Sequence, residues 1–299
     1  MRLFVRDADR RAALLADPAI GADPDLRVDA AAGPDWAALP AVALAVPDGA
    51  LVDVAAELRR RGAIGPTALI FHLAGALPAA HLAAPLAGLL SLQIAAAHPL
   101  AALPDPLTLV PGPARRAGLR ALTGATWALC GEPDAILALR RLVGPLIRHT
   151  LRLAPADRAA WHAAAAIVAN DLAALLMIGE AVALSAGVEP AAVRAGHLHR
   201  AHSALQALAA VPAKGPLWRG LTGAVRRGDA ATIGHHLAVL QQAAAEAPAL
   251  AALQAAAPTH RLLSSVLVES LAAGQALDTV QLRALRAALQ PPSSGPSDA

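Results

Sequence analysis

The first half of the chain alternates short apolar runs with stretches of helical periodicity. The runs have the length and composition of buried strands, at residues 3–5, 41–46, 67–72, 90–95, 126–130 and 149–153. Two of them are followed by helical segments, at residues 50–61 and 133–147. A strand followed by a helix, repeated along a chain, predicts an α/β domain with a parallel sheet.

The pattern changes after Pro155. Residues 156–186 form one long helical pattern without an internal proline, which ends at Gly187, and helical periodicity then continues to residue 289. These patterns predict three regions: an α/β domain at residues 1–153, an all-helical domain at residues 155–289 and a disordered tail at residues 290–299.

The apolar run at residues 3–5 is followed at once by Arg6 and Asp7. In a nucleotide-binding β-α-β unit, the end of the second strand meets the ribose of the nucleotide. No apolar strand and no glycine-rich loop stand ahead of residues 3–5. We therefore expect residues 3–5 to be the second strand of such a unit. A start codon placed too late would account for the absence of the first strand and its loop, a segment of about 25–30 residues.

The composition restricts the classes of protein. The net charge is only +3 and no basic stripe is interleaved with aromatic residues, so we expect no nucleic-acid partner. Cys130 is the single cysteine, which leaves no internal disulfide and suits a reducing cytoplasm. The N-terminus carries charges and no apolar signal segment. Residues 62–104 lack charge, but prolines and histidines interrupt them repeatedly, so we expect buried strands there and no membrane span.

Polar residues follow three of the predicted strands. In open α/β sheets, ligands bind outside the carboxyl ends of the strands. Val46, Pro47 and Asp48 stand at such an end, although Asp48 could equally cap the next helix. His72 and His98 stand at the ends of the next two strands, where a histidine could act as a general acid or base. The alternative for each histidine is a hydrogen-bonded core residue.

The second half of the chain offers weaker candidates. Asn170 follows His162 by eight residues, roughly 80° around a helix axis, so both could border one crevice. The alternative for Asn170 is a helix cap or a hydrogen bond between helices. Histidines cluster at residues 197–202, but no HExxH motif and no acidic partner set accompany them, so we assign no metal ligands. Arg226 and Arg227 could meet an anionic substrate or be solvated.

Five segments, taken in order, resemble one family of proteins. They are AVALAVPDGAL from residue 41, FHLAG from 71, AHPLAAL from 97, ADRAAWHAAAAIVANDLAALL from 156 and LTGAVRRGDAATIGHHLAVL from 221. The family comprises uncharacterised bacterial Rossmann-like proteins with a C-terminal helical domain of unknown function. It is similar to ketopantoate reductase, pyrroline-5-carboxylate reductase and prephenate dehydrogenase. The resemblance extends from residue 3 to residue 285.

The resemblance implies an architecture and a partner set. It implies an NADP-binding Rossmann-like domain that lacks its first strand, followed by a helical domain like the C-terminal domain of 6-phosphogluconate dehydrogenase. It also implies a small anionic metabolite as substrate and a homodimer built through the helical domain. Arg6 falls where such proteins hold the 2′-phosphate of NADP, and Val46, Pro47 and Asp48 fall beside the cofactor.

The same resemblance implies roles for the polar residues of the crevice. His98 resembles the histidine that prephenate dehydrogenases carry near their substrate, and Asn170 resembles the crevice asparagine of the reductases. The catalytic lysine of the ketopantoate reductase type has no counterpart here, and we select His162 as its replacement.

Two classes of function follow. The first is an NADP-dependent oxidoreductase, in which a histidine supplies or accepts the proton that accompanies hydride transfer at a C=O or C=N carbon. The second is a non-catalytic binding or interaction module of Rossmann origin that has lost its cofactor. The absence of the glycine loop and of the lysine from this sequence favours the second class, whereas the ordered motifs favour the first.

Overall fold

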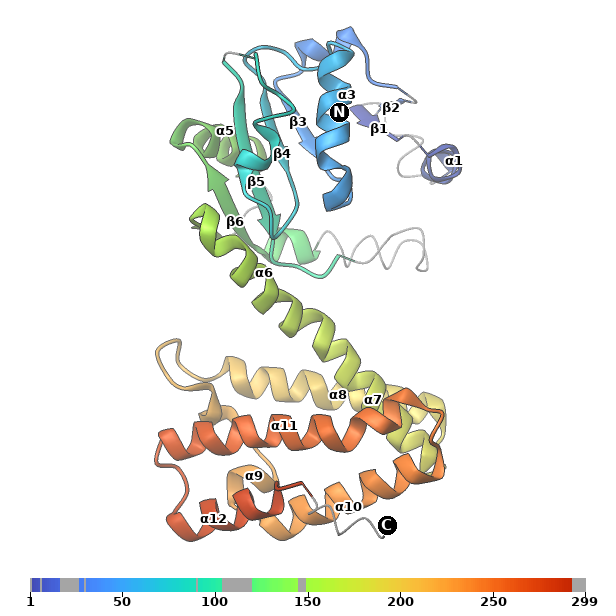
Figure 1. Cartoon of the computed structure of the whole chain (residues 1–299), viewed down its shortest axis with the longest axis vertical. Coiled ribbons are helices and arrows are strands. Elements are labelled where there is room, and N and C mark those ends of the chain that lie inside the picture. Colours follow the sequence, from blue (N-terminus) through green and yellow to red (C-terminus); the bar gives the residue numbers. More distant parts are fainter. Residues whose placement is uncertain are drawn as a thin grey trace, which may run out of the picture. The chain divides into compact units, whose positions relative to one another are not determined.

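The computed structural model of the chain describes residues 2–5, 7–16, 27–29, 31–89, 91–103, 120–144 and 149–291. The chain divides into two compact units, Met1–Ala169 and Asn170–Ala299. The first unit contains all of the described strands, and the second is built of helices (Figure 1). The division falls inside the long helical run that begins after residue 155.

The described strands of the first unit form two sheets. A two-stranded parallel sheet joins β1 (Arg2–Phe4) to β2 (Arg27–Asp29), and α1 (Ala8–Ala16) follows β1. The larger sheet has the order β3 (Ala41–Leu44), β4 (Leu69–His72), β5 (Gln93–Pro99), β6 (Thr126–Gly131) and β7 (His149–Arg152). Each predicted strand is present within a few residues. The apolar pattern does not indicate β2, because Val28 is its only apolar residue.

One strand pair runs against the expected parallel direction. β5 and β6 are antiparallel, with His98 opposite Ala128 and Ala95 opposite Gly131, whereas the other described pairs are parallel. The sheet is therefore mixed. Strand direction does not follow from an apolar run, because a strand buried on both faces reads the same in either direction.

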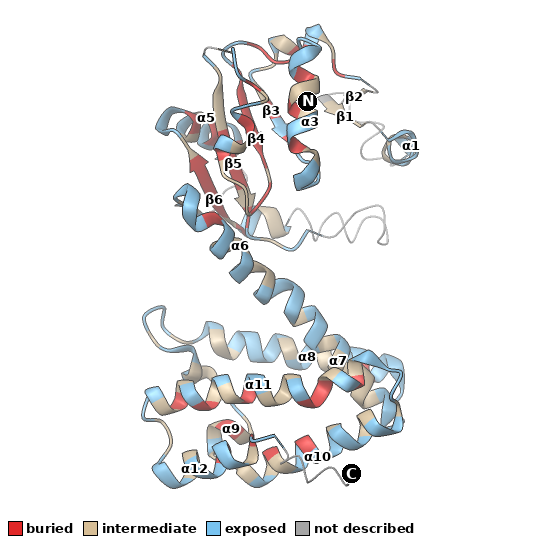
Figure 2. Ribbon diagram, in the orientation of Figure 1, coloured by how far each residue is buried: buried red, intermediate tan, exposed pale blue. Residues whose placement is uncertain are grey.

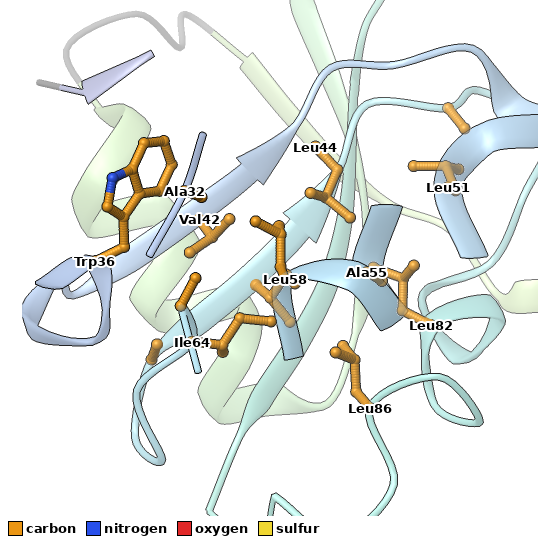
Figure 3. Close-up of a cluster of buried hydrophobic side chains, with 14 residues drawn as sticks. Ala32, Trp36, Val42, Leu44, Leu51, Ala55, Leu58, Ile64, Leu82 and Leu86 are labelled. Atoms are coloured by element: carbon orange, nitrogen blue, oxygen red, sulfur yellow. The ribbon is translucent and has the colours of Figure 1, made fainter. Parts of the chain in front are cut away.

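Helices cover both faces of the larger sheet. On one face, α3 (Leu51–Arg60) buries Leu51, Ala55 and Leu58, which recur at helical spacing and point toward the strands (Figure 3). On the other face, α5 (Pro133–Val143) buries Leu139. Alternate residues of β4 enter the two clusters: Ile70 belongs to the first, and Leu69 and Phe71 belong to the second. This alternation explains the unbroken apolar reading of the strand.

The predicted helical run is present as one continuous series. It contains the 3₁₀ turn η5 (Pro155–Asp157), α6 (Arg158–Ala166), the π-helical turn η6 (Ile167–Asp171) and α7 (Leu172–Ser185). By length and composition, Pro155–Ser185 could cross a membrane, with a mean hydropathy of 1.8 and none of its most apolar window buried. Figure 2 shows intermediate and exposed residues along α7.

The second unit contains five further described α-helices: α8 (Pro190–Ala209), α9 (Ala224–Arg227), α10 (Ala230–Glu246), α11 (Ala251–Ala273) and α12 (Thr279–Ala288), with the 3₁₀ turn η7 (Leu217–Gly220) before α9. Its core includes Ile233 and Leu237 of α10 and Val268 of α11. Asp229 caps α10, because its carboxylate accepts a hydrogen bond from the Thr232 amide at 3.0 Å.

Candidate functional site

His98 lies at the carboxyl end of β5 and is half-buried. Its Nδ1 donates a hydrogen bond to the Leu73 carbonyl oxygen, 2.9 Å away, in the turn that follows β4. A carbonyl oxygen can only accept, so Nδ1 carries the proton of the neutral ring and Nε2 is the basic nitrogen. The turn after one strand thus selects the tautomer of a histidine on the next strand.

The surroundings of His98 favour its neutral form. Burial is the largest influence and lowers the pKa of His98 below the ordinary value of 6.5, and the charges of His162 and Arg158 lower it further. The hydrogen bond to Leu73 and the charge of Asp48 act in the opposite direction and only partly offset this effect. His98 is therefore a neutral base near pH 7, with an available lone pair on Nε2.

Helix α6 brings two aromatic side chains against His98. The ring centroid of His162 lies 5.0 Å from that of His98, and that of Trp161 lies 5.9 Å away, both in edge-to-face geometry. Gly75 makes room for this packing, because a Cβ at that position would collide with the His162 ring. Nδ1 of His162 is buried and meets no hydrogen-bond partner among the described residues. His98 and His162 therefore lie side by side, and the catalytic roles that the resemblance implies for them stay predictions.

Arg158, in the first turn of α6, is the site residue that the sequence patterns do not identify. Its side chain is 0% exposed, and Nη2 donates to the Ala74 carbonyl oxygen at 2.7 Å. Its Nε and Nη1 have no hydrogen-bond partner within the described part of the chain. Burial lowers the pKa of Arg158, although an arginine remains charged at any physiological pH.

A signal for Arg158 does exist in the sequence. A cation in the first turn of a helix opposes the helix dipole, and Arg158 directly follows Asp157 at the predicted helix start. An interaction elsewhere must therefore compensate for the unfavourable position of this cation. In the structure, the guanidinium donates to the Ala74 carbonyl oxygen in the turn after β4, next to the Leu73 carbonyl that binds His98.

His72 lies at the end of β4 and is fully buried. Its Nε2 donates to the Pro78 carbonyl oxygen at 3.2 Å, and its Nδ1 has no hydrogen-bond partner among the residues described. Burial lowers the pKa of His72, with a smaller contribution from the charge of Arg158. This is the arrangement of a hydrogen-bonded core histidine, the alternative considered above.

The residues predicted to bind the cofactor differ in how far they are buried. Val46 packs against the core below α3, Pro47 is exposed, and Asp48 begins the 3₁₀ turn η2 (Asp48–Ala50) after β3. Leu44 of β3 pairs with His72 of β4, and His72 pairs with Ala96 of β5, so the three strands end side by side. The charge of Asp48 acts to raise the pKa of both His72 and His98. Pro47, not Asp48, occupies the N-cap position of η2. Arg6 lies outside the described residues.

Asn170 is exposed and belongs to the second unit, so its predicted role in the crevice stays a prediction. The region of the chain that the structure covers contains no group of three or more histidine, cysteine or acidic side chains that could hold a metal ion. A separate cavity of about 620 Å³ is lined by Ile94 near the start of β5, by Cys130 and by Arg152. It lies toward the opposite end of β5 from His98.

The described residues match one part of a dinucleotide and not another. Asp48 and His98 lie at the carboxyl ends of β3 and β5, the edge of an open α/β sheet at which ligands bind. A pyrophosphate needs a glycine-rich turn at a helix N-terminus, and the described residues include no such turn. The described residues therefore supply a ligand-binding edge of the sheet without a turn for the pyrophosphate.

The sheet of the first unit and the helices of the second are the parts of a Rossmann-like fold with a C-terminal helical part. Residues 125–256 match the model of one family, the domain of unknown function DUF2520. The match begins just before β6 and ends within α11. The resemblance drawn from the sequence motifs is confirmed over these residues.

Solved structures support the same fold class. Protein TM1727 of Thermotoga maritima is 15% identical, with a TM-score of 0.56, 91% of this chain covered and 90% of that one. Protein BF3122 of Bacteroides fragilis, a proposed NADP oxidoreductase, is 12% identical, with a TM-score of 0.59 and coverages of 89% and 87%. An imine reductase of a Pseudomonas species is 15% identical, with a TM-score of 0.52 and coverages of 97% and 90%. A comparison with curated proteins gives no match.

Proposed function

We propose that this chain is an NADP-dependent oxidoreductase that transfers a hydride to or from a small anionic metabolite, with His98 as the residue that moves the proton. The observation that carries the proposal is the fixed tautomer of His98 at the carboxyl end of β5, with Nδ1 bound to Leu73 and Nε2 available. Proteins of the same fold that are named as an NADP oxidoreductase and an imine reductase support the reaction class.

The chain's own part in the reaction is proton transfer and positioning. A bound nicotinamide would supply or accept the hydride. In the oxidative direction, neutral His98 takes the proton of the substrate hydroxyl or amine on Nε2, and C=O or C=N forms as the C–H bond breaks. In the reductive direction, the protonated ring returns that proton to the oxygen or nitrogen. His162 and Trp161 hold the ring of His98 from the side of α6.

The preference for an anionic substrate rests on charge. Arg158 brings a buried positive charge next to the turn that orients His98, and no carboxylate pairs with it among the described residues. Because Arg158 is fully buried, we assign it as a positioning residue that acts through Ala74 and Leu73. An anion near Nε2 of His98 would feel the unneutralised charge of Arg158 in a low-dielectric environment.

Five other predicted residues keep their roles in the proposal. Arg6 would hold the 2′-phosphate that distinguishes NADP, Val46, Pro47 and Asp48 would border the cofactor, and Asn170 would face the substrate. A homodimer through the helical unit and a cytoplasmic location are also part of the proposal. Size-exclusion chromatography with light scattering measures the dimer directly.

Titration of the full chain with NADPH, followed by the fluorescence of the dihydronicotinamide, tests cofactor binding. We expect saturable binding, and NADPH consumption with some members of a panel of small oxo and imino acids. His98→Asn should lower turnover by about 10²–10⁴-fold while NADPH affinity is kept. The matched control is His149→Asn, at an exposed histidine of β7. Absence of NADPH binding at millimolar concentration would overturn the proposal in favour of a non-catalytic module.

A further inference from the structure

The helical unit contains a groove that the proposed reaction does not use. It has a volume of about 580 Å³, which is within the usual range for small-molecule sites. Helix α7 lines it with Leu175, Ile178 and Val182, which recur at helical spacing on one face. α10 and α11 complete the walls, with Val239 and Leu263 among the apolar side chains. All lining residues lie within the second unit.

Four histidines interrupt this apolar lining: His197 of α8, His235 and His236 of α10, and His260 of α11. The rings of His236 and His260 lie 5.5 Å apart, centroid to centroid, and are tilted by 54°. Nε2 of His260 is buried and has no hydrogen-bond partner in the described structure. A buried polar atom without a partner is costly, so a ligand in the groove would gain free energy if the His260 ring turned to bond it.

The charge of the groove selects the sign of the ligand. Its lining includes four histidines and no aspartate or glutamate. Burial, and then the charge of His236, lowers the pKa of His260, which disfavours its protonation. A negative ligand would offset both effects, because an anion stabilises a protonated His260. A metal ion is a poorer match, because no three of the described histidine, cysteine or acidic side chains are placed to hold one.

We propose that this groove binds a small amphipathic monocarboxylate, with its apolar body against α7 and its carboxylate against His236 and His260. The class follows from the two parts of the lining: an apolar wall large enough for an aliphatic or aromatic body, and a cluster of histidines at one place on it. The proposal concerns the second unit alone. It therefore stands or falls independently of the oxidoreductase proposal.

A larger side chain at Gly179 would test whether ligands occupy the groove. Gly179 lies in α7 beneath the ring of His197, and a Cβ there would be 3.5 Å from that ring, an ordinary contact. A leucine at this position would extend into the groove, while leucine favours the helix more than glycine does. Gly179→Leu should therefore fill the site and leave α7 intact. Gly196→Leu in α8 is the matched control, because nothing lies within 4 Å of a Cβ at Gly196.

The experiment is calorimetric titration of the full chain with 4-phenylbutyrate and with 4-phenylbutanol, which has the same body without the charge. We expect the acid to bind more tightly by at least about tenfold, because a hydrogen bond to a charged group is worth that much. Gly179→Leu should abolish binding and Gly196→Leu should keep it. His260→Gln should weaken binding of the acid alone, whereas His199→Gln, at an exposed histidine outside the groove, should not.

Three results would each overturn the proposal. Equal affinity for the acid and the alcohol would show an apolar site without charge selection. No binding of either compound at millimolar concentration would show that the groove is not a ligand site. A change from dimer to monomer in Gly179→Leu, without carboxylate binding by the original chain, would show that a second copy occupies the groove.

Discussion

Replacing Arg158 by methionine removes a fully buried charge while keeping a long apolar side chain. The loss includes the hydrogen bond from Nη2 to the Ala74 carbonyl oxygen at 2.7 Å, worth about 1.5–3 kcal/mol for a charged donor. The substitution also removes the desolvation cost of an unpaired buried cation, which stabilises the folded state by several kcal/mol. No described carboxylate pairs with Arg158, so the substitution would leave no buried negative charge without a partner. We therefore expect the free energy of unfolding to change by less than about 2 kcal/mol.

The same substitution should change the titration of the neighbouring histidines. The charge of Arg158 lowers the pKa of His98 and of His72, so Arg158→Met should raise both. Urea denaturation measures the stability, and NMR titration of the histidine ring protons measures the pKa values. Arg158→Lys keeps the charge and should leave the pKa of His98 low, which separates charge from packing.

Arg152→Met is the matched control, because Arg152 is an exposed arginine at the end of β7. It should change neither the stability nor the pKa of His98. A loss of more than about 3 kcal/mol in Arg158→Met would refute the reasoning, because that is the cost of breaking a buried ion pair. An unchanged pKa of His98 in Arg158→Met would refute the electrostatic part.

Three further predictions concern stability. The chain should become less stable as the pH falls below 6.5, because the folded state lowers the pKa of His72, His98 and His260 and the unfolded chain therefore takes up protons first. Urea midpoints measured from about pH 7 to about pH 5 test this prediction, and a constant midpoint would contradict it. Gly75→Ala should cost about 1–3 kcal/mol in thermal or urea unfolding, because its Cβ collides with His162, and a neutral result would mean that the ring moves freely. Asp229→Ala should cost about 1 kcal/mol through loss of the α10 cap, Asp229→Asn should keep most of it, and equal losses in both would exclude the cap.

Local patterns account for most elements of the fold. The apolar runs predict β3, β4 and β6, and helical spacing predicts α3 and α5. In β4 and β6 the run is unbroken because strands buried on both faces need apolar residues at every position. The cap of α10 is also local, because Asp229 bonds to the amide of Thr232, three residues further on. In the site, His98 and His162 are recognisable because they are polar residues at a strand end and on a helix that resembles a known family.

The patterns fail where the outcome depends on a distant segment. The antiparallel direction of β6 leaves no mark on its composition, and β2 is held by pairing with β1 more than by its own residues. His72 and His98 look alike in the sequence, but packing makes one a core residue and leaves the other half-buried.

The sequence by itself determined the elements, their order and which polar residues stand at strand ends, because periodicity and turn residues act within a few positions of the chain. Only the tertiary structure decided how these residues work together. His98 receives its tautomer from a carbonyl 25 residues away, and Arg158 reaches across 84 residues to the neighbouring carbonyl. Such contacts are set by packing between segments, and a hydrogen bond between distant residues leaves no periodic trace in either one.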